Sequence, residues 1–166
     1  MRGFKLLLTL ISIVSLSTCG IYSPYGAATS GASNFSIKYF ETVHPLVSAS
    51  TSITISEELI DRVQKQSTLQ LVDSQGELQF EGKVIGWTVQ PINVQGNETA
   101  GANRVTITVD VIFTNTIEPD LSFQRKFNRF YDLPSSQDIH SNTDFVVEEI
   151  AALLSQDIFN ASLGNW

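Results

Sequence analysis

Hydrophobic and polar residues alternate with a period of two through the middle of this chain, most clearly in "RVTITVDVIFT", residues 104–114. One side of this segment is apolar: Val105, Ile107, Val109, Val111 and Phe113. The other side is polar: Arg104, Thr106, Thr108 and Asp110. This pattern predicts an antiparallel strand with one face in the core and one face in water. Similar patterns predict four more strands: 35–40, 69–73, 78–94 and 121–132.

The strand predicted over residues 78–94 changes its pattern part-way along. Its apolar residues occupy even positions up to Val84 and odd positions from Ile85 onward. The change falls beside Gly86, and a glycine inside a strand is typical of a bulge or a sharp twist. In the strand over 121–132 the alternation is carried by Phe123, Phe127 and Tyr131.

Two segments have the periodicity of a helix instead. Residues 52–66 place Ile53, Leu59, Ile60 and Val63 along one side, and Thr54 with Glu57 resembles a capping box. Residues 142–162 carry a longer apolar stripe: Val147, Ile150, Leu154, Ile158 and Ala161. The acidic residues near the start of this segment suit the positive end of a helix dipole.

The element order is therefore β-α-β-β-β-β-α. A run of hairpin-linked strands framed by two helices is typical of a two-layer α+β sandwich. We expect two helices on one face of a four- to five-stranded, mainly antiparallel sheet, forming a single domain over residues 35–166. Residues 133–142 and the stretch after Phe40, interrupted by Pro45, are expected to be loops.

The first residues do not belong to this domain. Arg2 and Lys5 precede an apolar run that ends near Leu16, which is the pattern of a signal peptide over residues 1–18. The run is too short to span a bilayer, which takes about 20 apolar residues. The single cysteine of the chain, Cys19, follows at once.

The sequence Leu16-Ser17-Thr18-Cys19 resembles the bacterial lipobox, in which the cysteine becomes the acylated first residue of the mature chain. Thr18 departs from the small residue usual at that place. Acyl chains would anchor the protein, since each buried CH₂ contributes about 0.8 kcal/mol. Gly20 and the lack of acidic residues nearby favour, by resemblance to bacterial sorting rules, the periplasmic side of the outer membrane. Residues 19–34, rich in Gly, Ser, Ala and Pro, are expected to be a flexible tether.

Composition narrows the class of protein further. Without residues 1–18 the chain has 148 residues and a formal charge of −9 rather than −7, because that segment holds two basic and no acidic residues. An acidic domain is a poor general binder of nucleic acid or anionic headgroups. With one cysteine no internal disulfide can form, so stability depends on a packed core, to which the nine Phe beyond residue 18, of ten in the chain, can contribute.

Candidate catalytic and metal-binding groups are few. His44 and His140 are far apart in sequence, and no cysteine or acidic cluster joins them at metal-ligand spacing. The loop containing Ser135, Ser136, Asp138 and His140 has the residue types of a hydrolase triad but no nucleophile elbow. We therefore expect no enzymatic activity, no metal and no cofactor.

Half of the basic residues beyond the signal peptide lie on two neighbouring predicted strands: Arg104, Arg125, Lys126 and Arg129. One interpretation is a local anion site on the wet face of the sheet. The other is that these side chains pair with carboxylates, such as Asp110 or acidic groups of a partner. Alternation places Arg125 and Arg129 on one face of their strand and Lys126 on the other, and the register relative to Arg104 is open.

The pattern as a whole resembles the family of the lipopolysaccharide (LPS)-assembly lipoprotein LptE. The stretches that carry the resemblance are "CGIYS", "LVDSQGELQFEGKVIGWTVQPINVQGN" with "NRVTITVDVIFTN", and "FNRFYDLPSSQ" before "EEIAALLSQDIFNASLGNW". Together they span most of residues 19–166, and the specificity lies in their sum and order. The resemblance implies a non-enzymatic outer-membrane lipoprotein with a fold of two helices on a four-stranded sheet. It also implies a plug inside the LptD β-barrel that helps LPS reach the outer leaflet.

Residue roles within that resemblance are open. Contacts with LPS phosphates would fall to Arg104, Arg125 and Arg129, because guanidinium groups match phosphate geometry. Two alternative classes remain: a free periplasmic lipoprotein that binds a lipid or solute, which needs a deep apolar pocket, and an exported hydrolase.

Overall fold

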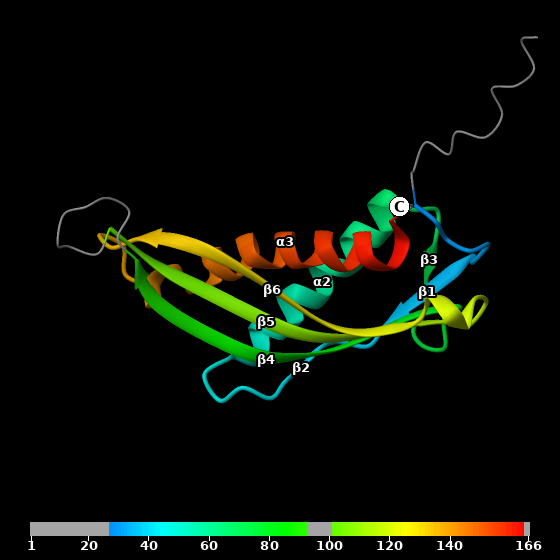
Figure 1. The fold of residues 1–166 in the computed structure, drawn as a ribbon, viewed down its shortest axis with the longest axis horizontal. Coiled ribbons are helices and arrows are strands. Elements are labelled where there is room, and N and C mark those ends of the chain that lie inside the picture. Colours follow the sequence, from blue (N-terminus) through cyan, green and yellow to red (C-terminus); the bar gives the residue numbers. More distant parts are fainter. Residues whose placement is uncertain (1–26, 93–100, 165–166) are drawn as a thin grey trace, which may run out of the picture.

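The computed structural model describes residues 27–92 and 101–164, which form two layers (Figure 1). The chain contains these elements in order: β1 (Asn34–Ile37), β2 (Glu41–Thr42), α2 (Ala49–Gln66), β3 (Gln70–Leu71), β4 (Leu78–Ile92), β5 (Ala102–Asn115), β6 (Phe123–Pro134) and α3 (Thr143–Leu163). Two short 3-10 helices, η1 (Pro119–Leu121) and η2 (His140–Asn142), lie in the connections after β5 and β6. The predicted order of the main elements is confirmed.

The sheet is mixed, with an antiparallel majority. Its strand order is β3-β1-β4-β5-β6, and β2 pairs with β4. Strands β4, β5 and β6 are antiparallel to one another, whereas β1 is parallel to both β3 and β4, and β2 is parallel to β4. Parallel neighbours need a long crossover, and α2 provides it between β1 and β3. Both helices cover the same face of the sheet (Figure 1), so the predicted α+β sandwich is confirmed.

Strand β2 is the one strand that the alternation does not predict. It contains two residues, Glu41 and Thr42, which pair with Lys83 and Val84 of β4. The segment was expected to be a loop because two residues are too few to show a period. Its pairing depends on β4, which lies about forty positions further along the chain.

A β-bulge interrupts β4 where the apolar pattern changes. Val84 lies opposite Val109 and Gly86 lies opposite Thr108, so Ile85 is the extra residue. A bulge shifts every later side chain to the other face. As a result Trp87 lies opposite Ile107, which is fully buried, and both halves of β4 direct apolar residues toward the helices.

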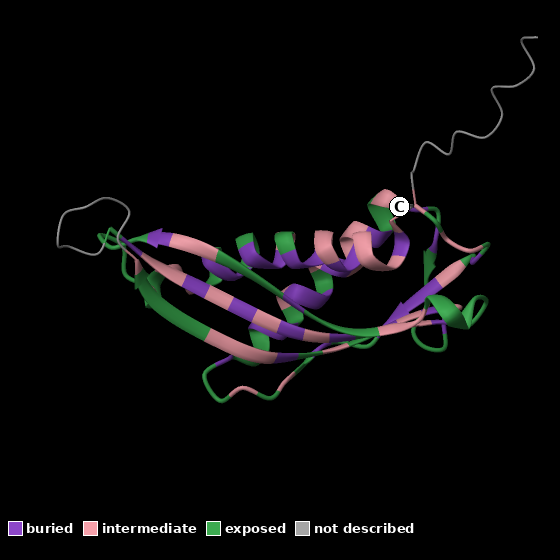
Figure 2. Ribbon diagram, viewed as in Figure 1, coloured by how far each residue is buried: buried purple, intermediate pink, exposed green. Residues whose placement is uncertain are grey.

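The core lies between the helices and the helix-facing side of the sheet. The apolar residues of β5 predicted for this side are at most 1% exposed, and buried and partly exposed residues alternate along the strand (Figure 2). Fully buried side chains from other elements complete the core: Phe35, Leu78, Phe80, Ile55, Leu59, Ile150, Leu154 and Ile158.

Helix α2 begins earlier than predicted. Its N-cap is Ser48, whose side chain accepts a hydrogen bond from the Thr51 amide, so the capping box expected at Thr54 is wrong. The buried side contains Ile55, Leu59 and Val63, whereas Ile53 is 43% exposed. The prediction that Ile53 faces the core is therefore wrong, and Ile55, which the predicted stripe omits, is a core residue.

Helix α3 follows its predicted stripe closely. Val147, Ile150, Leu154 and Ile158 are buried, and Ala161 is partly buried. The helix also buries Val146, Ala151 and Phe159. It therefore presents a broad apolar surface to both β6 and α2.

Arg62 of α2 joins the two helices. Its side chain, 15% exposed, donates hydrogen bonds to Ser155 Oγ at 2.8 Å, to Gln156 Oε1 at 2.6 Å and to the Ala152 carbonyl oxygen at 3.0 Å. Glu58 lies 3.3 Å from the same guanidinium group. A mostly buried cation is tolerated only when its donors are satisfied, and this arrangement sets the position of α3 along α2.

The described part of the predicted tether lies against the domain. Ala27 bridges Gly164, the Ala28 amide donates to the Leu163 carbonyl oxygen at 2.7 Å, and Ala32 is buried. The chain therefore enters the domain beside the end of α3 (Figure 1). Cys19, the signal peptide over residues 1–18 and the first part of the tether lie outside the described residues. Within the part of the chain that the structure describes, no helix has the length and apolar character to span a membrane.

Replacing Ile107 by Ala should destabilise the domain by about 2–5 kcal/mol, because the side chain is fully buried between β5 and the helices. The matched control is Thr108→Ala, the next residue, which faces away from the helices and should cost less than about 1 kcal/mol. Chemical unfolding of both variants measures the difference. Equal losses would show that the helix-facing side of β5 is not the core.

Candidate functional site

The face of the sheet away from the helices is uncovered, and we call it the open face. It is made of the side chains of β4, β5 and β6 that alternate with the core residues. Cross-strand pairs lie on the same face, so the register lists its members: Gln79, Glu81, Lys83, Thr88 and Gln90 on β4; Arg104, Thr106, Thr108, Asp110 and Ile112 on β5; and Gln124, Lys126, Asn128, Phe130 and Asp132 on β6. This surface is polar, with three acidic and three basic residues that balance in charge, and Ile112 and Phe130 are exposed on it by 42% and 44%.

Arg104 is held within the open face by two contacts. Its guanidinium group makes a forked ion pair with Asp132, the residue opposite on β6, with Nε–Oδ1 and Nη2–Oδ2 distances of 2.7 and 2.8 Å. The same group lies 3.8 Å from the centre of the Phe130 ring. Paired donors and a stacked plane together orient the arginine along the sheet.

The ion pair changes the acidity of both partners. The hydrogen bond from Arg104 holds the pKa of the Asp132 carboxyl below its ordinary value of 3.8. The hydrogen bond to Asp132 raises the pKa of Arg104. Both side chains are about one-third exposed, so solvent screens the pair and its contribution to stability is small.

Arg129 lies on the other side of the sheet. It is opposite Ile107 on the helix-facing side and makes a forked ion pair with Asp157 of α3, with an Nη2–Oδ1 distance of 2.6 Å. This hydrogen bond raises the pKa of Arg129. Arg129 therefore connects the edge strand β6 to the helix that covers it.

Arg125 also belongs to the helix-facing side, opposite Val111, but it is exposed at the edge of the sheet. Its guanidinium carbon lies 5.3 Å from the centre of the Phe123 ring. Among the described residues, no carboxylate lies within ion-pair distance of Arg125 or of Lys126.

The structure does not bring the predicted basic residues together as one anion site on the wet face. Arg104 and Lys126 share the open face, and Arg125 and Arg129 lie on the opposite side of the same strand. Lys126 pairs in register with Asp110, six positions along β5 from Arg104, which is about 20 Å in a strand. Alternation in residues 121–132 already placed both arginines with Phe127, a core residue, and that signal could have separated them from Arg104.

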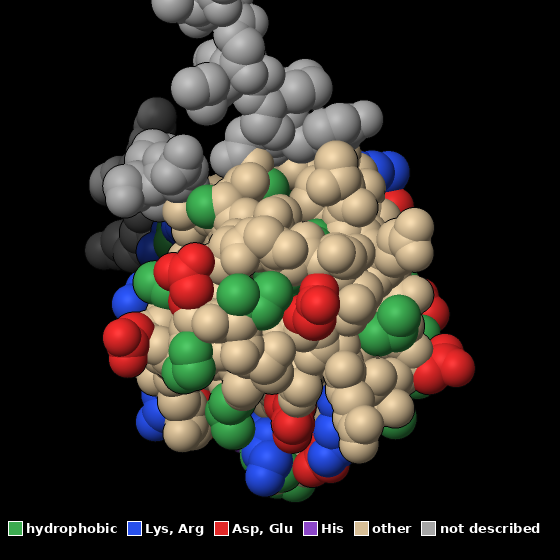
Figure 3. Space-filling view, turned by 90° about the vertical axis from the view of Figure 1, so that its right-hand side faces the viewer, with side chains coloured by type: hydrophobic (Ala, Val, Ile, Leu, Met, Phe, Trp, Pro, Cys, Tyr) green, Lys and Arg blue, Asp and Glu red, His purple; other side chains and the backbone are tan. Residues whose placement is uncertain are grey.

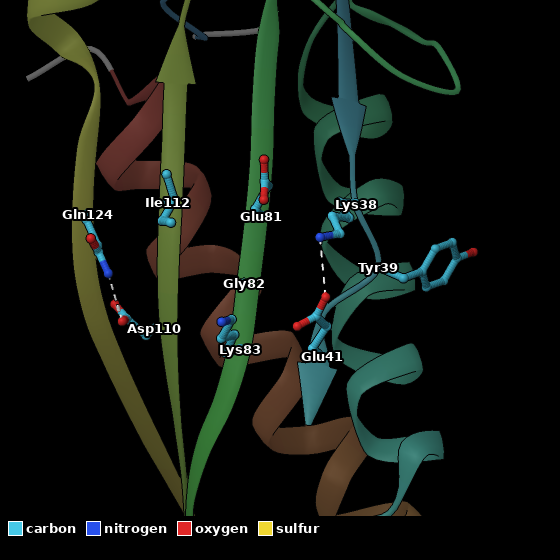
Figure 4. A pocket seen from close by; sticks show the side chains of 9 residues that line it. All are labelled: Lys38, Tyr39, Glu41, Glu81, Gly82, Lys83, Asp110, Ile112 and Gln124. Carbon is cyan, nitrogen blue, oxygen red and sulfur yellow. Dashed lines mark hydrogen bonds and ion pairs between the residues drawn. The ribbon is translucent and has the colours of Figure 1, made fainter. Parts of the chain in front are cut away.

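A small hollow of about 120 Å³ lies on the open face where β1 and β2 meet β4 (Figure 4). Its walls carry charges of both signs, and some are already paired: Lys38 with Glu41 at 3.3 Å, and Gln124 with Asp110 at 2.9 Å. Tyr39 points away from the other side chains (Figure 4). A hollow this small, with charged residues in its walls, is unlike a site for a small-molecule ligand.

A larger hollow of about 420 Å³ lies between β4 and the first turns of both helices. Its lining combines apolar and polar side chains: Leu46, Ser48, Thr51, Trp87, Val89, Ile139, His140 and Thr143. Leu46 is 74% exposed and Val89 is 40% exposed, so the hollow is an open groove.

In the loop that contains Ser135, Ser136, Asp138 and His140, the Asp138 side chain stabilises the local backbone. The Asp138 carboxylate accepts hydrogen bonds from the Ser141 amide at 2.8 Å and the Ser141 hydroxyl at 2.9 Å, at the start of η2. The backbone hydrogen bond is the larger cause that lowers the pKa of Asp138. In residues 27–92 and 101–164, no three His, Cys, Asp or Glu side chains are placed to hold a metal ion.

Figure 3 shows the end of the molecule near the described N-terminus. Hydrophobic side chains are scattered there among polar and charged ones (Figure 3). The uncovered surface that extends over all three long strands is the open face.

These features define a class: a small two-layer α+β domain with one covered and one open, polar sheet face. The chain belongs to the LptE family of lipopolysaccharide-assembly proteins, whose model matches residues 35–162. A search of curated proteins finds no significant match.

Solved structures share the fold at low sequence identity. The hypothetical protein CT253 from Chlamydia trachomatis is 12% identical, with a TM-score of 0.54 over 76% of this chain and 93% of that one. A minor lipoprotein from Acinetobacter baumannii is 12% identical, with a TM-score of 0.51 over 80% of this chain and 97% of that one. At such identities the likeness establishes the fold alone.

The Arg104–Asp132 pair predicts a specific acid dependence of stability. Because the pKa of Asp132 is lower in the folded than in the unfolded protein, the pair stabilises the fold above the ordinary pKa of 3.8. This contribution is lost as the pH falls below 3.8. Asp132→Asn should therefore lower the melting temperature at pH 6 and have progressively less effect toward pH 2.

The control for this measurement is Asp73→Asn, an exposed carboxylate outside the ion pairs of the described residues. Thermal unfolding of both variants and the wild type from pH 2 to pH 7 gives the comparison. An Asp132→Asn effect that does not change with pH would contradict the ion pair.

Proposed function

We propose that this protein is an outer-membrane lipoprotein that fills the lumen of an LptD-type β-barrel, supports assembly of that barrel and assists LPS transport to the outer leaflet. The observation that carries the proposal is the family match over residues 35–162. The protein is attached to the membrane on the periplasmic side and does not act on nucleic acid.

The open face suits a position inside a barrel. The interior of an outer-membrane barrel is polar and wet, and the open face offers Thr, Gln and Asn side chains together with acidic and basic side chains in equal number. Side chains of this kind form hydrogen bonds with a polar wall directly or through water. A strongly apolar face would fit that environment less well.

The proposed role is structural, without a catalytic step or a cofactor. The triad-like loop supports this view, because the Asp138 carboxylate accepts its hydrogen bonds from Ser141 at the start of η2. The protein would act by binding and by shaping its partner.

The anchor in this proposal is Cys19. It follows the apolar run of the signal peptide directly, and acyl chains on its mature N-terminus would hold the domain at the membrane. The described chain begins at Ala27, beside the end of α3, and this is the end of the domain opposite the hollow between the helix starts (Figure 1).

The LPS phosphate contacts predicted for Arg104, Arg125 and Arg129 stay a prediction. Two of these arginines already hold carboxylates, Asp132 and Asp157. A phosphate at either position would have to displace or share that partner. Arg125 is the member without a carboxylate within ion-pair distance among the described residues.

A periplasmic lipid- or solute-binding lipoprotein is the second candidate function. The observation that favours it is the groove of about 420 Å³, a volume within the usual range of small-molecule sites. Leu46 and Val89 are exposed, so the groove is open to solvent, and an enclosed pocket would support this second function more strongly.

The native lipoprotein, purified from membranes in mild detergent, should carry an outer-membrane barrel protein in a stable ratio. An unrelated lipoprotein with the same affinity tag is the control for unspecific capture. Mass spectrometry identifies the barrel, and native mass measurement gives the ratio. A wild-type sample that purifies without any barrel, but with bound lipid or solute, would favour the second candidate function.

Cys19→Ser should abolish acylation and leave the protein with its signal peptide attached. The matched control is Ser17→Ala, which keeps a small residue inside the lipobox and should be processed normally. Intact-mass measurement of the wild type should show a mature chain that begins at Cys19 and carries acyl groups. A free thiol at Cys19 in the mature wild-type protein would rule out the anchor.

A further inference from the structure

The two edges of the sheet differ in length. On one side lie β3 and β2, which contain two residues each. On the other side lies β6, with twelve residues, and among the described residues it pairs with β5 alone. A long edge strand presents a row of unpaired backbone groups, which can pair with a strand of another chain.

The register shows which backbone groups face outward. The Ser135 amide donates to the Gly101 carbonyl oxygen at 3.3 Å, one step beyond the Ala102–Pro134 pair. Hydrogen-bonded and non-hydrogen-bonded pairs alternate along an antiparallel ladder. The odd-numbered residues of β6 therefore bond to β5, and the even-numbered ones direct their N–H and C=O groups away from the sheet: Gln124, Lys126, Asn128, Phe130 and Asp132.

The pairing of β5 with β4 gives the same assignment of backbone hydrogen bonds. The Thr116 amide donates to the Glu77 carbonyl oxygen at 2.9 Å, one step beyond the Leu78–Asn115 pair. Even-numbered residues of β5 thus bond to β4, and odd-numbered ones bond to β6. The hydrogen bonds at the two ends of the sheet therefore assign outward-facing N–H and C=O groups to the same five residues of β6.

The outer edge of β6 is basic on a protein that is acidic. Residues 123–131 contain Arg125, Lys126 and Arg129 and no acidic residue. Arg129 is neutralised by Asp157, but no carboxylate among the described residues lies within ion-pair distance of Arg125 or Lys126. Helix α3, which lies beside β6, contains four acidic residues and no basic one: Asp144, Glu148, Glu149 and Asp157.

These charges select the kind of strand that can be added. Lysine and arginine on an edge oppose pairing with another basic edge, so two copies of β6 would repel each other. Because Arg125 and Lys126 point to opposite faces, acidic residues at neighbouring positions of an added strand would meet both. Exposed Phe130, at 44%, offers an apolar contact further along the same edge.

We infer that the outer edge of β6 is a strand-addition site for an extended, acidic segment of the barrel partner. This inference rests on the proposed function, because it names how that partner is held. The added segment pairs with the outward backbone groups of Gln124, Lys126, Asn128 and Phe130, and its carboxylates neutralise Arg125 and Lys126. Main-chain hydrogen bonds supply affinity in this mode of recognition, and side chains supply selectivity.

The test replaces Asn128 by Pro in the full-length, lipidated protein. Proline removes an N–H that faces outward, and edge positions of this kind tolerate proline. The matched control, Asn128→Thr, keeps the N–H and favours a strand. We expect both variants to melt within a few degrees of the wild type. Asn128→Pro should co-purify at least ten-fold less barrel, and Asn128→Thr should co-purify the wild-type amount.

A second measurement does not depend on a variant. Residue-resolved hydrogen exchange compares the wild-type lipoprotein alone with the barrel complex. The amides of Lys126, Asn128 and Phe130 should exchange at least ten-fold more slowly in the complex, whereas those of Phe127 and Arg129 are protected in both samples by their bonds to β5.

The outcomes separate the two proposals. A folded Asn128→Pro variant that retains the barrel, or fast exchange of the even-numbered amides in the complex, would overturn the strand-addition site and leave the proposed function intact. A wild-type protein that never carries a barrel would overturn the proposed function and this inference with it. If Asn128→Pro fails to fold, the exchange measurement alone decides.

Discussion

The structure depends on one constraint: the long sheet has helices on one face only. Strand β5 lies in the middle of the antiparallel part, and its side chains toward the helices are at most 1% exposed. Shifting its register by one residue would put this entire set into water. The positions of β4 and β6, the bulge at Ile85 and the docking of both helices all follow from keeping these residues covered.

The one-sided cover of the sheet also determines which partners the charged side chains meet. Arg104 and Asp132 meet because they lie opposite each other on the open face, and Arg129 reaches Asp157 because it lies on the helix-facing side at the edge. Arg62 occupies the seam between α2 and α3, where its hydrogen bonds are directed at one turn of α3. The arginines therefore hold layers and strands together, which leaves the open face polar but nearly neutral.

An LPS-assembly family member with this surface is well suited to work through a partner. It combines a covered core, an open polar face and a long basic edge. Its stability would be supplied by the core, so the uncovered surfaces are available for binding without loss of the fold. The groove between the helix starts is a separate feature at one end of the sandwich.

The sequence by itself determined the class of fold, the order of the main elements and the residues of the β5 core. It also marked the bulge beside Gly86 and the family, because alternation, helical stripes and short motifs are local and can be read without knowing any contact. Tertiary structure decided the strand β2, the start of α2 at Ser48, and the partners of the arginines. Asp132 and Asp157 each lie 28 positions from the arginine they bind, and such pairs depend on strand register and on helix docking, which no local pattern encodes.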